Sequence, residues 1–167
     1  MSEYPQYPTE PGQQPGGPAY GAPAARGPRP TSVDTAVKLI WATIVLSLVS
    51  AVVTFVLIDT LIDQQLEASG VTLDEGSIRS IVLASAVFGL VISVGITALL
   101  AIFIGKGHNW ARIVYTVLVA IGVLLSLFGI GSQPVLLLVL GLLSAVLSIA
   151  AVVFLFRSDA NAWFKAR

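Results

Sequence analysis

Three carboxylates in one short segment have a spacing that could bind a cation. Asp59, Asp63 and Glu67 are four residues apart, so they share one face if the segment is helical. Like charges at this spacing destabilise a helix by about 0.2–0.5 kcal/mol per pair. A divalent cation such as Ca²⁺ or Mg²⁺ would offset the repulsion because both prefer carboxylate oxygens, and so would a basic partner. The alternative, which we favour, is an acidic face that is simply solvated.

No other combination of residues points to catalysis. The single histidine, His108, has neither a carboxylate cluster nor a cysteine near it in the sequence. A catalytic or metal-binding histidine needs such partners. The chain contains no cysteine, which excludes disulfides, thiolate metal sites and cysteine nucleophiles. We therefore predict that the protein is not an enzyme and that it binds no cofactor and no metal.

The segments that must position these residues are long and apolar. Hydrophobic residues make up 56% of the 167 residues, charged residues make up 11%, and the mean hydropathy is +0.89. That is too little polar surface to cover a soluble domain of this size. A helix crosses ~30 Å of hydrocarbon with about 20 residues. Three uncharged stretches meet this length, and the third, residues 113–156, is long enough for two crossings with a Gly-rich, Pro-ended interruption at 128–134. They predict membrane spans at about 37–58, 80–104, 112–130 and 135–156.

The basic residues indicate how these spans are oriented. Eight of the nine would lie on the side that both termini share, whereas only Arg79 would lie on the other side. The eight are Arg26, Arg29, Lys38, Lys106, Arg112, Arg157, Lys165 and Arg167. Because basic residues stay on the cytoplasmic side, both termini are predicted to be cytoplasmic. Trp41, Trp110 and Trp163 fall near the same interface, where an indole ring is favoured.

Short patterns mark the ends of the spans. Thr31 and Asp34 have capping-box spacing before the first span. Gly105, Lys106 and Gly107 follow the second span, where a left-handed glycine cap and a cation at a helix C-terminus are both favourable. Residues 158–167 are predicted to form a short cytoplasmic interfacial tail, with Trp163 and Phe164 in the headgroup layer.

Small residues recur every fourth position along the second span. The stripe consists of Ser85, Gly89, Ser93, Thr97 and Ala101. Small side chains allow helices in lipid to approach closely, and their hydroxyls add interhelical hydrogen bonds. We favour packing within one four-helix bundle over a dimer interface. Gly89→Leu is then expected to disrupt assembly or to lower the amount of protein in the membrane.

The N-terminal 32 residues have a different composition. They hold eight of the nine prolines and five glycines, with little aliphatic content beyond alanine. Such a segment cannot bury enough apolar surface to fold, so residues 1–32 are predicted to be a disordered, proline-rich cytoplasmic tail with polyproline-II character. The run from Tyr4 to Pro8 could dock in an aromatic groove of a protein partner. The alternative is an inert soluble leader.

Three short motifs give the chain a family resemblance. They are Arg29–Val33 leading into Trp41, Gly107–Val114, and the closing Ser158 with Asn161–Phe164. Together they resemble small actinobacterial four-span membrane proteins with a Pro/Gly-rich N-terminal tail. The resemblance implies the four-span topology and supplies neither an activity nor site residues.

The sequence thus predicts an all-α protein, a four-helix transmembrane bundle over residues 33–157 that follows the disordered tail and sits in the cell membrane. No Asp, Glu, Lys, Arg or His lies within the uncharged stretches, which argues against proton relays and voltage sensors. The balanced charge offers no field for nucleic acid. We predict a structural or interaction protein whose tail recruits membrane or cytoplasmic partners. The alternative is a small transporter, channel subunit or accessory protein, and the oligomeric state stays open.

Overall fold

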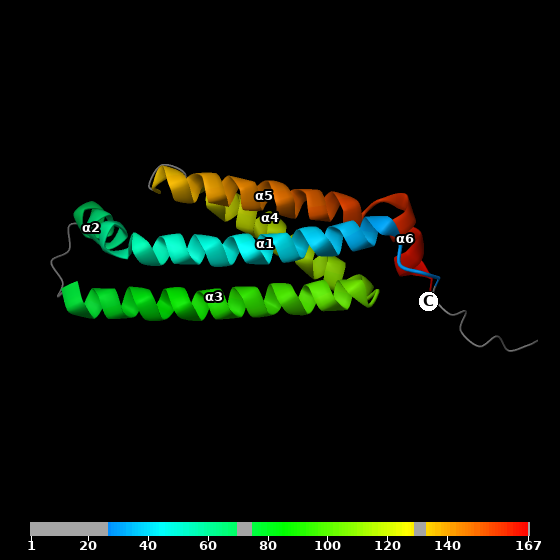
Figure 1. Ribbon diagram of the computed structural model, residues 1–167, viewed down its shortest axis with the longest axis horizontal. Helices are drawn as coiled ribbons and strands as arrows, with labels where there is room; N and C mark the ends of the chain where they lie inside the picture. Colours follow the sequence, from blue (N-terminus) through cyan, green and yellow to red (C-terminus); the bar gives the residue numbers. More distant parts are fainter. Residues whose placement is uncertain (1–26, 70–74, 129–132, 167) are drawn as a thin grey trace, which may run out of the picture.

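The computed structural model describes residues 27–69, 75–128 and 133–166, which form six helices and no strand (Figure 1). The predicted all-α fold is therefore confirmed for the part of the chain that is described. Residues 1–26 of the predicted disordered tail lie outside it. The four long helices are α1 (Thr31–Val56), α3 (Glu75–Gly105), α4 (Asn109–Phe128) and α5 (Val135–Leu155), and the two short ones are α2 (Ile58–Ser69) and α6 (Ser158–Lys165).

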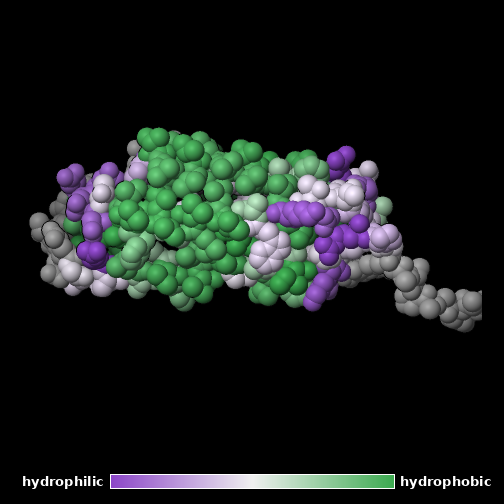
Figure 2. Space-filling model, viewed as in Figure 1, coloured by the Kyte–Doolittle hydropathy of each residue, from purple (hydrophilic) through white to green (hydrophobic). Residues whose placement is uncertain are grey.

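Each long helix is apolar enough and long enough to cross a membrane. Even the shortest, α4, has 20 residues and spans about 30 Å at 1.5 Å per residue. Apolar side chains that would be buried in a soluble protein are exposed on the surface, such as Phe55 (65%) and Phe128 (89%). Figure 2 shows this apolar surface as a broad band with hydrophilic residues at both ends. The chain is an integral, multi-pass membrane protein, and this band is the surface that faces lipid.

The four long helices pack as a ring. α1 packs against α5 and α3, and α4 packs against α3 and α5, so that α4 crosses obliquely behind α1 in Figure 1. Ile58 and Ile62 of α2 are buried at the opposite end, but the cluster of buried residues that forms the hydrophobic core lies at the end of the ring near α6. It consists of Val33, Ala36, Ile40, Leu100, Ala101, Ile104, Ala111, Tyr115, Ala151, Leu155, Ala160 and Phe164. We call this the α6 end and the opposite one the α2 end.

Two predicted helix ends differ in detail from the structure, and a third agrees with it. α1 begins at Thr31, but its N-cap is Pro30, which is held extended and makes no side-chain cap, so the predicted capping box does not form. The first span, predicted at about 37–58, ends at Val56, and the acidic segment forms the separate helix α2 after Leu57. Gly107 has the positive φ of 83° that a left-handed cap requires, which confirms the predicted end of α3.

Candidate functional site

A buried arginine joins three helices at the α6 end. Arg112 of α4 is 7% exposed and donates hydrogen bonds to Asn161 Oδ1 (2.7 Å) and to the carbonyl oxygen of Leu155 (3.4 Å). Its guanidinium lies 5.0 Å from the ring centroid of Phe156 and 4.8 Å from that of Phe164. Asn161 also donates to the carbonyl oxygen of Phe156 (2.8 Å), at the C-terminal end of α5. This set of contacts, the Arg112 clamp, fixes α6 across the ends of α4 and α5.

The clamp corrects one prediction about α6. Phe164 was expected in the headgroup layer, but it is only 2% exposed because its ring packs beneath Arg112 and into the core. Its neighbour Trp163 is half-buried, and its indole nitrogen donates to the carbonyl oxygen of Gly27 (3.2 Å). The other two tryptophans, Trp41 and Trp110, are exposed, as an interfacial anchor requires.

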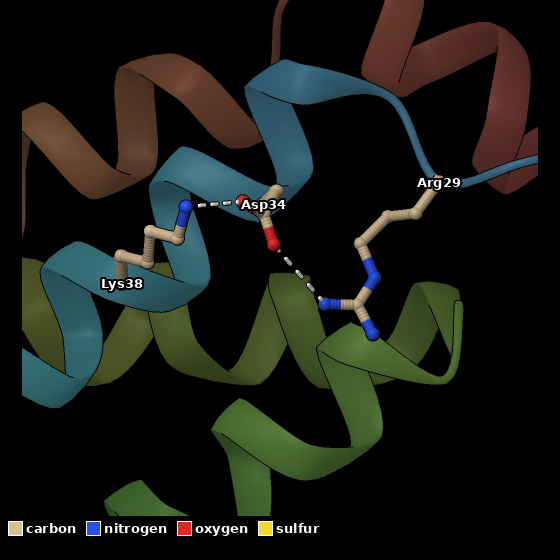
Figure 3. Close-up of polar contacts among 3 residues, drawn as sticks. All are labelled: Arg29, Asp34 and Lys38. Atoms are coloured by element: carbon tan, nitrogen blue, oxygen red, sulfur yellow. Dashed lines mark ion pairs between the residues drawn. The ribbon is translucent and has the colours of Figure 1, made fainter.

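The chain that leads into α1 is held on this same end of the bundle. Asp34 pairs with Lys38 (2.7 Å) and with Arg29 (3.6 Å), as Figure 3 shows. The Arg29 guanidinium also lies against the end of α3, where a Cβ added to Gly105 would be 3.4 Å from it. A cation is favoured there because the carbonyl groups at a helix C-terminus carry partial negative charge. Residues 27–30 are thus tied to the bundle by contacts with α1, α3 and α6.

A further contact joins the start of α1 to α6. The neighbouring Ser32 hydroxyl is the main cause that lowers the pKa of Asp159, with smaller contributions from backbone N–H groups and from Arg157. Partial desolvation opposes this shift. Asp159 stands in the first turn of α6, where a carboxylate is favoured by the helix dipole.

The single histidine has a packing role. His108 lies in the turn between α3 and α4, and its ring makes an edge-on contact with Phe103, 5.3 Å between centroids. Its backbone N–H donates to the carbonyl oxygen of Phe103 (3.0 Å), which completes the cap of α3. No group of three or more histidine or acidic residues that could hold a metal occurs in the described parts of the chain.

The acidic residues that could have bound a cation lie on α2. Asp59 forms an ion pair with Arg79 at the start of α3, with 3.0 Å between Oδ1 and the guanidinium nitrogen. Asp63 and Arg79 line the same small cavity, whereas Glu67 is exposed outside it. The structure therefore supplies part of the counter-charge from the chain itself and does not assemble the three carboxylates as a set of ligands.

The small-residue stripe of α3 meets three different environments. Ala101 is fully buried in the core, and Ser93 and Thr97 line a cavity. Gly89 faces open space, because a Cβ added there would meet nothing within 4 Å. Ser85 is exposed and donates its hydroxyl to the carbonyl oxygen of Val82 on its own helix (2.9 Å). Only Ala101 is in the close helix packing that the stripe predicted for all five.

A central cavity lies between the four long helices. Its volume is about 400 Å³, and half of its lining residues carry hydroxyl groups. These are Thr43, Ser93, Thr97, Tyr115, Ser126, Ser144 and Ser148. None of the described lining residues is Asp, Glu, Lys, Arg or His.

The surroundings of the central cavity differ toward the two ends of the bundle. A second cavity of about 550 Å³ shares Gly141 with it and reaches Gln64 of α2 and Gln133 before α5. On the other side Tyr115 belongs both to the cavity wall and to the hydrophobic core, so the core closes the α6 end. Sequence reasoning missed this cavity, although Ser144 and Ser148 have the i,i+4 spacing that puts two hydroxyls on one face of α5.

No protein-family model matches the chain, and no curated protein or solved structure is detectably similar to it.

Proposed function

We propose that this protein is a membrane scaffold that displays its N-terminal tail to cytoplasmic protein partners. In this proposal the α6 end faces the cytoplasm, both termini are on that side, and the tail rather than the bundle makes the recruiting contacts. The chain acts without catalysis, cofactor or metal. The resemblance to small actinobacterial four-span proteins with a similar tail is part of the proposal.

The observation that carries the proposal is the attachment of the tail to the bundle. The segment from Gly27 to Pro30, which directly follows the first 26 residues in the sequence, is bonded to the bundle through Trp163 and through Arg29. Polyproline-II segments bind aromatic grooves with little loss of entropy because they are already extended. The proline-rich run from Tyr4 to Pro8 is separated from this point by enough chain to reach a partner beyond the headgroups.

The experiment is affinity capture of the full chain in mild detergent, compared with a chain that lacks residues 1–26 but keeps Gly27. Two double variants distinguish an effect of the Tyr4–Pro8 run from an effect of tail length. The first is Pro5→Ala with Pro8→Ala, and its matched control is Pro15→Ala with Pro18→Ala. We expect the deletion and the first pair to lose the same partners and the control pair to keep them. An unchanged set of partners for the deletion would leave the tail as an inert leader and refute the recruiting function.

The orientation is tested separately. The described basic residues of the predicted cytoplasmic set belong to the α6 end, whereas Arg79 lies at the α2 end. A tag placed after Arg167 is expected to be reachable only after intact cells are permeabilised. A tag that can be labelled from outside intact cells would reverse the assignment of the two ends.

A second candidate function is supported by the two neighbouring cavities, which share Gly141 in their walls. A bundle with an interior cavity between its four long helices has the architecture of a small transporter, channel subunit or accessory protein. Reconstitution in liposomes and measurement of solute flux tests this candidate. Flux above that of protein-free liposomes is expected if the cavity opens to both sides during a cycle, and the absence of flux for a broad panel of solutes would leave the scaffold function alone.

A further inference from the structure

We propose that the central cavity is filled with water and binds a small uncharged polyol. The inference extends the second candidate function, but it concerns occupancy and not transport, so it can be tested whether or not a solute crosses the membrane.

The first observation is that several hydroxyls of the cavity wall already donate their hydrogen atoms to backbone carbonyl oxygens. Thr43 donates to the carbonyl oxygen of Leu39 (3.0 Å), and Ser144 donates to that of Leu140 (2.9 Å), each within its own helix. A hydroxyl carries one donor and two acceptor lone pairs, so each retains acceptor capacity toward the cavity. An occupant that donates hydrogen bonds satisfies them, whereas a lipid acyl chain does not.

The second observation is a buried donor at the end of the cavity. The side chain of Tyr115 is 4% exposed, and its hydroxyl has no hydrogen-bond partner among the described residues. Ser148, which also lines the cavity, lies beside it. A buried hydroxyl without a partner is costly, and a roomy cavity whose wall offers several hydroxyl groups as partners can hold water. At ~30 Å³ per molecule in the liquid, the cavity has room for roughly a dozen waters.

The third observation sets the chemical class of the solute. The described lining contains no ionisable side chain other than Tyr115, so a charged solute would find no counter-charge in a medium where an unpaired charge is costly. A polyol both donates and accepts hydrogen bonds, as the lining hydroxyls and Tyr115 require. Because the hydrophobic core closes the α6 end, the solute enters from the α2 end.

The absence of cysteine makes the test direct, because the full chain needs no background substitutions. Ser144→Cys and Ser148→Cys place a thiol in the cavity, and Leu143→Cys and Ile149→Cys place one on the lipid face of α5 as matched controls. Asp63→Cys on the exposed face of α2 is the aqueous reference. The protein is reconstituted in phosphatidylcholine vesicles, and two methanethiosulfonates, a neutral hydroxyethyl reagent and a trimethylammonium reagent, are supplied on both sides of the membrane.

A thiol reacts as the thiolate, which needs water. The neutral reagent is therefore expected to modify both cavity cysteines at least about 10-fold faster than their lipid-facing neighbours. The cationic reagent, relative to its own rate at Asp63→Cys, should be slower in the cavity by at least about 10-fold. Glycerol should slow modification at Ser144→Cys and leave Asp63→Cys unchanged. Equal rates at Ser144→Cys and Leu143→Cys would mean a dry or lipid-filled cavity, and entry of the cation or no protection by glycerol would overturn the polyol.

Discussion

Replacement of Asn161 measures how firmly α6 is held against the bundle. Asn161→Ala removes two side-chain hydrogen bonds, the one from Arg112 (2.7 Å) and the one to the carbonyl oxygen of Phe156 (2.8 Å). A hydrogen bond to a charged group contributes about 1.5–3 kcal/mol, and one between neutral groups contributes about 0.5–1.5 kcal/mol. The free energy of undocking α6 should therefore fall by about 2–4.5 kcal/mol, and the undocked population should rise roughly 30-fold to 2,000-fold.

Hydrogen exchange in lipid nanodiscs measures the population of molecules in which α6 is undocked. An eight-residue helix is not stable alone in water, so undocking exposes the amides of α6 to exchange. Peptides that cover Ser158–Lys165 should exchange faster in Asn161→Ala by the factor given above. Lys165→Ala is the matched control, because this exposed side chain lies on the same helix. Exchange in Asn161→Ala within about 3-fold of the control would refute the clamp.

A double-mutant cycle separates the Arg112 clamp from general loss of packing. Arg112→Met keeps a side chain that can lie beneath the same aromatic rings, but it removes the charge and the donor. If the two residues act through their mutual hydrogen bond, the double variant with Asn161→Ala should be less destabilised than the sum of the single variants by at least about 1 kcal/mol. Additive effects would mean that Arg112 and Asn161 stabilise α6 independently.

Three further predictions follow from the described contacts. Ala101→Leu should lower the melting temperature because overpacking of a buried site costs about 1–3 kcal/mol, whereas Gly89→Leu on the same stripe has open space and should change it little. A change at Gly89 alone would point to contact with a second copy. Folding lowers the pKa of Asp159, so the Asp159 carboxylate stabilises the protein at pH values above the usual pKa of an aspartate. This stabilisation is lost as the pH falls through the lowered pKa. Asp159→Asn should therefore make protein stability depend less on pH in the acid range. Arg79→Ala breaks an exposed ion pair with Asp59 and should cost less than about 1 kcal/mol in thermal unfolding.

The four spans could be predicted because hydrophobic length is a local property of the sequence. Lipid requires each crossing to satisfy its own backbone, so about 20 uncharged residues predict a helix without knowledge of its neighbours. The cap at Gly107 was predictable for the same reason, since a positive φ is a local requirement. The start of α1 was less predictable because the Asp34 carboxylate can bond either to a backbone N–H or to basic side chains, and in the structure it pairs with Lys38 and Arg29.

The Arg112 clamp could not be found in the sequence, because its members are 43 to 49 residues apart along the chain. In the sequence, Arg112 counts only as one of eight positive charges that set orientation. In the structure, Arg112 of α4 is buried against α5 and α6, and the ring of Phe164 is buried next to its guanidinium. An amphipathic pattern of eight residues cannot distinguish a helix that lies on headgroups from one that docks on protein, since both bury one face.

The placement of the core and the cavity at opposite parts of the bundle connects the two proposals. Close packing near α6 fixes the point where the tail leaves the bundle, and the Arg112 clamp adds polar bonds there that lipid cannot replace. Toward α2, the helices enclose hydroxyls and space instead of interlocking side chains. A rigid attachment point requires closely packed side chains, whereas a hydrated interior requires unfilled space. A four-helix ring can therefore provide both only at different depths along its axis. Substitutions that weaken the α6 end should therefore disturb the tail before they disturb the cavity, and a chain in which both change together would indicate that the two ends are coupled.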